Sequence, residues 1–198
     1  VRVWWPPHER HKVWGVFAGA ARTPSRTEHD FRAITSVIQP DSLFPGSPVA
    51  LVQLMGDDGF DSERLRALDV GYRAWLGDNV AVGFAGFRNT YADVRTNEPP
   101  DLAGIQVNQN PRHLVMPVRV DNLASARSWG GEATVDLQSS RRWRVRGAYS
   151  ILRFTFSTRE QSADLATLSY GEEEVEHMAS LRSSLNLGKD VALDLTAR

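Results

Sequence analysis

The chain has 198 residues, no cysteine, 24% charged residues and a net charge of −1 at pH 7. These values exclude a disulfide framework and a thiolate metal site, and they argue against nucleic acid as a partner. The longest apolar stretch, Val49 to Met55, falls far short of the roughly 20 residues of a membrane helix. A membrane role would therefore require a β-barrel, because only helices and closed sheets satisfy the backbone in lipid.

Alternating apolar and polar residues predict strands along most of the chain. A first strand is predicted over His11 to Ala21, between flanking prolines. The most regular pattern lies between Glu63 and Arg95, where every second residue from Leu68 to Leu76 is apolar. A tight turn at Gly77–Asn79 then leads into a second alternating run, which is typical of a β-hairpin with two unlike faces.

The later strands follow the same pattern. We predict them at Leu114 to Val120, Ala126 to Gln138, Trp143 to Phe156, Met178 to Leu187 and Val191 to Ala197. Long loops are predicted at 22–60, 94–113 and 157–176. Long loops and short turns alternate, which in an up-and-down barrel places all the short turns at one rim.

Two alternatives stay open on the sequence alone. Ser62 to Leu76 also has helical spacing, with Ser62 as a possible cap. A soluble β-rich or α+β ligand-binding module, unrelated to membranes, would bury the same apolar residues in one core.

Aromatic residues near the strand ends suggest interfacial girdles. Trp75 and Trp143 lie beside short turns, and Tyr149, Phe154 and Phe156 approach the opposite rim. Arg153 has the same alternation as the residues of its strand that are expected to face lipid. It is expected near the rim, because a lipid-facing arginine costs about 0–1 kcal/mol there and about 2–4 kcal/mol at the midplane.

Several segments carry a family resemblance in their order along the chain. They are ARTPSR from Ala21, GDDGFDSERLRALDVGYR from Gly56, FRNTYADVR from Phe87 and GGEATVDL from Gly130. In these the chain resembles the C-terminal barrel region of siderophore-receptor-like TonB-dependent outer-membrane receptors, with Asp69 where the family usually has glutamate. The resemblance covers most of the chain.

The resemblance implies an all-β fold of antiparallel up-and-down strands, about seven of them, forming part of a large barrel. Residues 1–198 would be a partial barrel domain from which the plug domain and the terminal strands are absent. The implied function is energised uptake of a scarce nutrient across a Gram-negative outer membrane, most often an iron–siderophore complex.

The implied partners are a metal–chelate or similar small nutrient, the plug domain of the same full-length chain, TonB through an N-terminal segment, and outer-membrane lipid. No enzyme activity, cofactor or metal site is predicted. The chain has no GxSxG elbow and no P-loop. His8-Glu9-Arg10-His11 lacks HExxH spacing, and the acidic cluster of Asp57, Asp58, Asp61 and Glu63 lacks EF-hand spacing.

Two groups of candidate site residues follow from the barrel interpretation. The predicted lumen-facing wall comprises Asp69, Arg73, Asn89, Arg144, Arg146 and Arg182. The residues predicted to capture ligand on the outer loops are Arg22, Arg26, His29, Arg32, Tyr91 and Arg112.

Overall fold

The computed structural model describes residues 1–166, 176–188 and 191–198. Within these ranges the chain is mostly strand, and a short α-helix and a 3₁₀ turn lie between strands. The elements are β1 (Arg2–His8), β2 (His11–Arg22), α1 (Arg26–His29), β3 (Arg32–Ile38), β4 (Ala50–Met55), β5 (Glu63–Leu76), β6 (Val80–Glu98), η1 (Leu102–Gly104), β7 (Gln106–Gln109), β8 (Arg112–Ser140), β9 (Trp143–Thr158), β10 (His177–Asn186) and β11 (Ala192–Ala197).

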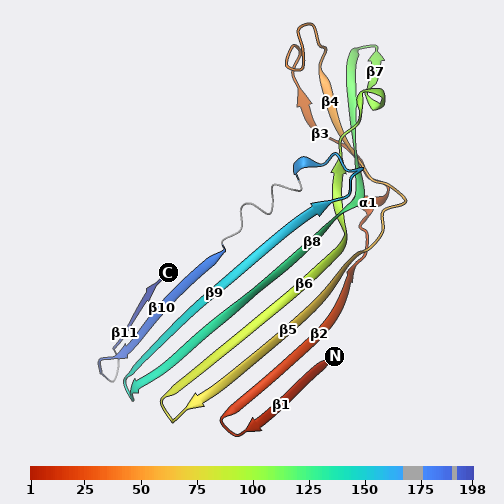
Figure 1. Ribbon diagram of the computed structural model, residues 1–198. Coiled ribbons are helices and arrows are strands. Elements are labelled where there is room, and N and C mark those ends of the chain that lie inside the picture. The colour runs from red at the N-terminus through yellow and green to blue at the C-terminus, as the bar shows by residue number, and fades with distance from the viewer. Residues whose placement is uncertain (167–175, 189–190) are drawn as a thin grey trace.

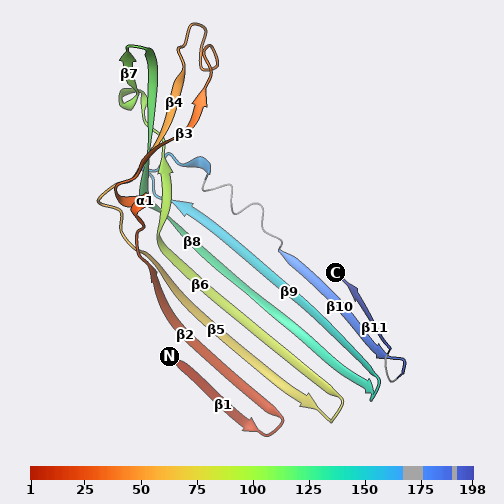
Figure 2. The ribbon, with the colours of Figure 1, turned by 180° about the vertical axis from the view of Figure 1, so that it is seen from behind.

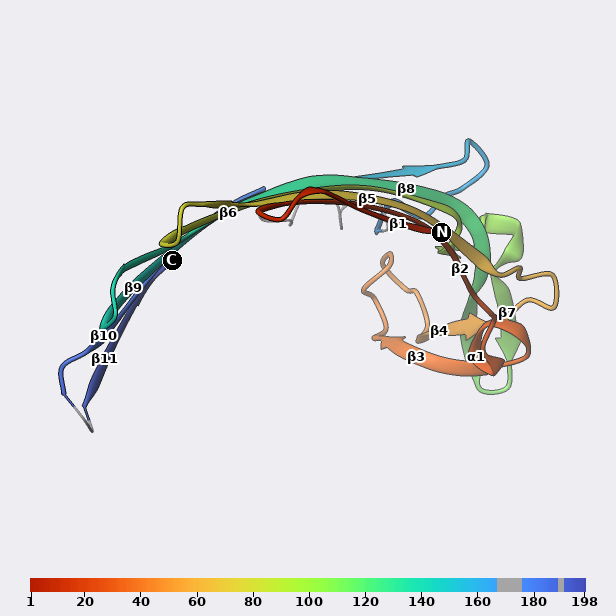
Figure 3. The same cartoon turned by 90° about the horizontal axis from the view of Figure 1, so that it is seen from below.

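One long antiparallel sheet dominates the molecule. Its strands follow the order β1-β2-β5-β6-β8-β9-β10-β11 (Figures 1 and 2). Seen from below, the sheet forms an open arc (Figure 3). In the part of the chain that the structure describes, β1 and β11 do not pair with each other, so the barrel wall is not closed.

The predicted hairpin between Glu63 and Arg95 is confirmed. β5 and β6 pair in continuous register from Arg64↔Ala92 to Leu76↔Val80. Gly77 adopts a positive φ of 70° in the turn, a conformation that glycine takes without steric cost. The helical alternative for Ser62 to Leu76 is therefore wrong.

The register gives the sheet two unlike faces. Leu68, Val70 and Tyr72 lie on the face that we call the apolar face, and Asp69 and Arg73 lie on the opposite, polar face. Large side chains on the apolar face are widely exposed. They are Phe17, Leu68, Val70, Leu76, Phe84, Trp129, Val135, Leu137, Trp143, Tyr149, Leu181, Leu193 and Leu195.

An extension rises from one end of the sheet (Figure 1). It contains β3, β4, β7 and the first part of β8, with β4 parallel to β8 and the other pairs antiparallel. Residues 22–60 were predicted as a loop, and this is wrong because α1, β3 and β4 lie within them. The loop predicted at 94–113 likewise contains the end of β6, η1, β7 and the start of β8.

Other strands are longer or more numerous than predicted. The two strands predicted at Leu114 to Val120 and Ala126 to Gln138 are one continuous strand, β8. β1 was not predicted, because Pro6 and Pro7 argue against a central strand; at the edge of a sheet, prolines are tolerated. Part of the loop predicted at 157–176, and part of the turn before Val191, lie outside the described residues.

A small polar and apolar core joins the extension to the sheet. Val120, Ala124 and Phe60 are buried there. Asn122 is also buried, and its amide nitrogen donates to the carbonyl oxygens of Asp93 at 2.6 Å and Asp61 at 3.1 Å. These bonds fix the bend at which β6 and β8 leave the sheet. None of the described helices is long and apolar enough to cross a membrane.

Candidate functional site

The register brings all six residues predicted for the lumen wall onto the polar face. Arg73 opposes Gly83, Asp69 opposes Phe87, and Asn89 opposes Ser128. Arg144 and Arg146 oppose Ser184 and Arg182 on the next strand. Period-two alternation is thus sufficient to group residues from β5, β6, β9 and β10.

Most arginines among these six are paired. Asp136 accepts hydrogen bonds from Arg144 and from Arg146 Nη2, the latter at 3.0 Å. Arg182 Nη2 lies 3.3 Å from Asp194 Oδ1, which also accepts a short hydrogen bond from Ser184. These pairs bridge neighbouring strands of the wall, with three arginines sharing two aspartates.

Arg73 belongs to a cation–aromatic cluster instead. Its guanidinium lies 5.1 Å from the Trp75 ring centroid, and Lys12 Nζ lies 4.8 Å from the same ring. Trp75 is on the polar face, as are Phe154 and Phe156. Their predicted place in lipid-facing girdles is therefore wrong, whereas Trp143 and Tyr149 do lie on the apolar face.

Two hollows open along the polar face. A hollow of about 450 Å³ is bordered by Trp14, Arg73, Glu132, Asp136 and Arg146. A second, of about 250 Å³, is bordered by Arg144, Arg146, Arg182 and Ser184. Sequence analysis did not identify Glu132 and Asp136. The signal was present, because both have the opposite parity to Val135 on β8 and so fall on the polar face.

At the other end of the sheet, Arg22 organises a buried acidic site. Its guanidinium donates to both oxygens of Glu28, at 2.7 and 3.0 Å, and to both oxygens of Glu63, at 2.8 and 2.9 Å. Glu28 is 2% exposed and also accepts from the backbone N–H of Ser25 at 2.8 Å. Ser25 and Glu28 form the capping box that begins α1.

These contacts lower the pKa of Glu28 to about 2 from an ordinary value of 4.5, chiefly through the hydrogen bonds from Arg22. Because the folded pKa lies below the unfolded one, Glu28 stabilises the fold fully above pH 4.5, and this stabilisation is lost as pH falls toward 2. In the full-length protein we expect hydrogen-exchange protection of the Glu28, His29 and Asp30 amides, corrected for intrinsic rates, to fall across that window. Glu28→Gln should remove most of this pH dependence; an unchanged profile would contradict it.

A third hollow lies beside α1, at the end of the sheet from which the extension rises. It measures about 480 Å³ and is bordered by His29, Asp30, Arg32, Met55, Gly56, Asp57, Asp58 and Arg119. Among the predicted ligand-capture residues, His29 and Arg32 meet here. No group of three or more His, Cys, Asp or Glu residues able to hold a metal occurs within the described ranges.

The other four predicted capture residues lie apart. Arg22 is engaged by Glu28 and Glu63, and Arg26 faces Asp30 at 3.5 Å. Tyr91 packs against Phe154 on the polar face, with ring centroids 5.8 Å apart. Arg112 begins β8 beside Gln109 of β7, in the extension.

A curved antiparallel sheet with one exposed apolar face and one ion-paired polar face is the wall of a membrane β-barrel. Residues 5–191 match the family described as TonB dependent receptor-like, beta-barrel, and the chain belongs to this family. Its members are transport receptors of the Gram-negative outer membrane, where this chain is therefore located.

Solved structures share the fold at low sequence identity. A mutant of the Pseudomonas aeruginosa ferric enterobactin receptor, in complex with enterobactin, is 16% identical with a TM-score of 0.67; the match covers 98% of this chain and 26% of that one. The FrpB iron transporter from Neisseria meningitidis is 15% identical (TM-score 0.65), with 96% and 24% covered.

The copper transporter OprC is 14% identical with a TM-score of 0.53, over 94% of this chain and 23% of that one. The chain thus spans about a quarter of the length of these receptors. No curated protein matches the chain.

Proposed function

We propose that this segment is part of the wall of a receptor that takes up a scarce nutrient by energised transport, with an iron–siderophore complex as the cargo. The polar face would line the lumen and the apolar face would meet lipid. The plug domain of the full-length chain would fill the lumen, and TonB would act on it through an N-terminal segment.

The observation that carries the proposal is the contrast between the two faces. More than a dozen large apolar side chains are exposed on one face, while arginines on the other pair with Asp136 and Asp194. A soluble protein rarely leaves such a continuous apolar surface uncovered. The soluble ligand-binding module considered above does not account for it.

The outer rim supplies groups suited to an anionic metal–chelate. Arg32 and Arg119 border the hollow of about 480 Å³ together with Asp30, Asp57 and Asp58, so their guanidinium groups act there beside carboxylates. Arg112 is exposed in the extension. Arginine binds carboxylate and catecholate-type oxygens through its planar fork of N–H donors. We propose that His29 and Arg32 make the first contacts, and that the paired arginines of the wall present a smooth, hydrated path.

Spin labels test the orientation of the wall. In the full-length receptor in bilayers, labels at Val70, Val82 and Leu193 should be accessible to oxygen dissolved in hydrocarbon. Labels at Arg73 and Arg146 should be accessible to a water-soluble paramagnetic reagent. Water accessibility at all five positions, or the reverse pattern, would refute the barrel orientation.

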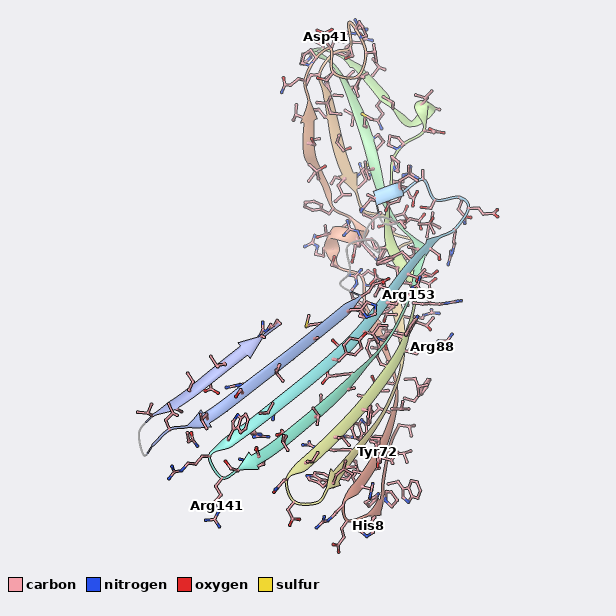
Figure 4. All side chains as sticks on the ribbon, turned by 60° about the vertical axis from the view of Figure 1, so that its left-hand side comes forward. His8, Asp41, Tyr72, Arg88, Arg141 and Arg153 are labelled. Atoms are coloured by element: carbon pink, nitrogen blue, oxygen red, sulfur yellow. The ribbon has the colours of Figure 1, made fainter. Side chains whose placement is uncertain are left out.

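Uptake of radiolabelled iron tests the cargo. Cells whose only siderophore receptor is the full-length protein should accumulate iron from a ferric siderophore, and loss of TonB should abolish accumulation. The double variant H29A/R32A should raise the half-saturating concentration about 100-fold or more, since two lost charge-assisted hydrogen bonds at about 1.5 kcal/mol each total about 3 kcal/mol. Arg141→Ala, which removes an exposed arginine at the opposite, short-turn end of the sheet (Figure 4), is the control. Equal uptake without TonB would exclude energised transport.

A further inference from the structure

Five arginines lie together on the apolar face, near the end from which the extension rises. We call them the arginine band: Arg64, Arg66, Arg88, Arg127 and Arg153. They come from four neighbouring strands, β5, β6, β8 and β9. In the register, Arg88 and Arg153 flank Trp129, and Arg66 and Arg127 flank Thr90. Figure 4 shows Arg88 and Arg153 close to the base of the extension, far from Arg141 at the short-turn end.

The band has no counter-charge of its own. All five side chains are exposed, and none makes an ion pair or side-chain hydrogen bond with another described residue. Glu63 and Asp69 on β5 and Glu132 on β8 have the parity of the polar face, and Glu63 is already paired with Arg22. On the polar face, in contrast, Arg144, Arg146 and Arg182 pair with Asp136 and Asp194. An unmatched cluster of one sign attracts anions from outside the chain.

The position of the band fits the edge of a bilayer. Ten residue steps lead from Trp143 to Arg153 on β9, from Leu137 to Arg127 on β8 and from Leu76 to Arg66 on β5, and eight lead from Val80 to Arg88 on β6. Eight to ten steps of strand at about 3.3 Å each, tilted by 35–45°, rise about 19–27 Å along the membrane normal. The apolar belt of an outer-membrane barrel is about 25 Å tall. The arginines therefore begin where hydrocarbon gives way to headgroups.

We propose that the arginine band binds the phosphate groups of an anionic lipid in the outer leaflet. A guanidinium donates two parallel N–H bonds to a phosphate, and strands about 4.8 Å apart place Arg88 and Arg153 roughly 10 Å from each other. That spacing accommodates a phosphate between them, above the indole of Trp129. The acyl chains would lie along the exposed Val70, Phe84 and Val135, which are nearer the short turns.

Continuity with the apolar face is the reason that the occupant is a lipid. Free phosphate has no apolar group that could contact the apolar surface beside the charges. A second copy of the chain would bring two bands of the same sign together, which is unfavourable. The inference rests on the apolar face meeting lipid, and it is independent of which cargo the receptor transports.

Lipid binding to the purified full-length receptor in nonionic detergent tests the proposal. Native mass spectrometry would compare phosphatidic acid with phosphatidylcholine of the same acyl chains, with inorganic phosphate as a competitor. Wild type should prefer phosphatidic acid. R88Q/R153Q should weaken its binding roughly 25-fold, about fivefold for each arginine removed, while R88K/R153K should retain most of it. The matched control R141Q/R142Q removes the same charge from the short turn and should leave the preference intact.

Other outcomes would overturn the proposal. Unchanged preference in R88Q/R153Q would show that the band does not bind the lipid, and millimolar inorganic phosphate that displaces the lipid completely would identify a free anion as the occupant. Loss of a dimer in R88Q/R153Q would identify a second copy of the chain as the occupant of the band. Folding of each variant is checked by the barrel's heat-dependent gel mobility. If the spin labels report lipid and these variants bind normally, only the band proposal fails and the proposed transport function stands.

Discussion

Replacing Arg22 by alanine should open the base of the extension in the full-length receptor. Glu28 would remain as a buried carboxylate, with Arg95 Nη1 at 3.7 Å as its nearest remaining cation. Removing one partner of a buried ion pair costs about 3–5 kcal/mol. We expect the lower end, about 3 kcal/mol, because Arg22 is itself partly exposed and Arg95 still contributes.

Hydrogen exchange at α1 measures this effect directly. A loss of about 3 kcal/mol raises the local opening equilibrium roughly 150-fold, which should appear at the amides of Glu28, His29 and Asp30. These amides bond to carbonyls of the same turn, so they exchange only when the turn opens.

Two further variants serve as controls for Arg22→Ala. Arg26→Ala removes a neighbouring arginine whose side chain is 93% exposed and whose pair with Asp30 spans 3.5 Å, and it should change protection by less than about 0.5 kcal/mol. R22M/E28M removes both charges and should recover part of the lost protection, because the buried Glu28 carboxylate is gone and the half-buried Glu63 still accepts from the backbone N–H of Arg95 at 2.9 Å. Equal effects of Arg22→Ala and Arg26→Ala would contradict the network's structural role.

The same network shows what a sequence can reveal about this fold. Ser25 and Glu28 have capping-box spacing, so the start of α1 has a local signature in the sequence. The pairing of Arg22 with Glu63 has none, because it joins residues 41 positions apart. The sequence therefore predicts that Arg22 is a loop arginine free to bind ligand. In the structure its N–H donors bind Glu28 and Glu63 instead.

Strands with a local alternating pattern were predicted, and strands held by distant pairing were not. Alternation identified β2, β5, β6 and β9 because each has one apolar face and one polar face. It did not identify β3 and β4, which lie above the sheet among several prolines. β4 is held by parallel pairing with a distant segment of β8, from Ala50↔Leu114 to Met55↔Arg119. Such pairing leaves no local signature, because the partners are far apart in sequence.

Parity predicted more about the candidate site than composition did. The six residues expected on the wall share one face because alternation is strict across paired strands. Arg153 was assigned to the apolar face by the same rule, which the pairing of Arg153 with Trp129 confirms. The four other arginines of the band lie near Arg153 because of the register between neighbouring strands. The sequence of a single strand does not specify that register.

An arginine placed in the middle of the apolar face should have the second large effect. Val70 lies between Gly15 and Gly86 in the register, so a longer side chain has room, and sterics alone would not exclude Val70→Arg. A lipid-facing arginine near the midplane nevertheless costs about 2–4 kcal/mol. Folding of the full-length receptor into phospholipid bilayers, followed in guanidinium chloride, should show a loss of that size.

Ala85→Arg is the matched control for the opposite face. Ala85 pairs with Gly71, one residue from Val70, and opposes Glu132 on β8. An arginine there would face the lumen and a cross-strand carboxylate rather than lipid, so we expect a change within about 1 kcal/mol. Both variants add one positive charge at the same level of the wall, and only the face differs. Equal losses for the two would mean that the sheet does not separate lipid from lumen, whereas a large loss for Val70→Arg alone fixes which side of this open arc faces the membrane.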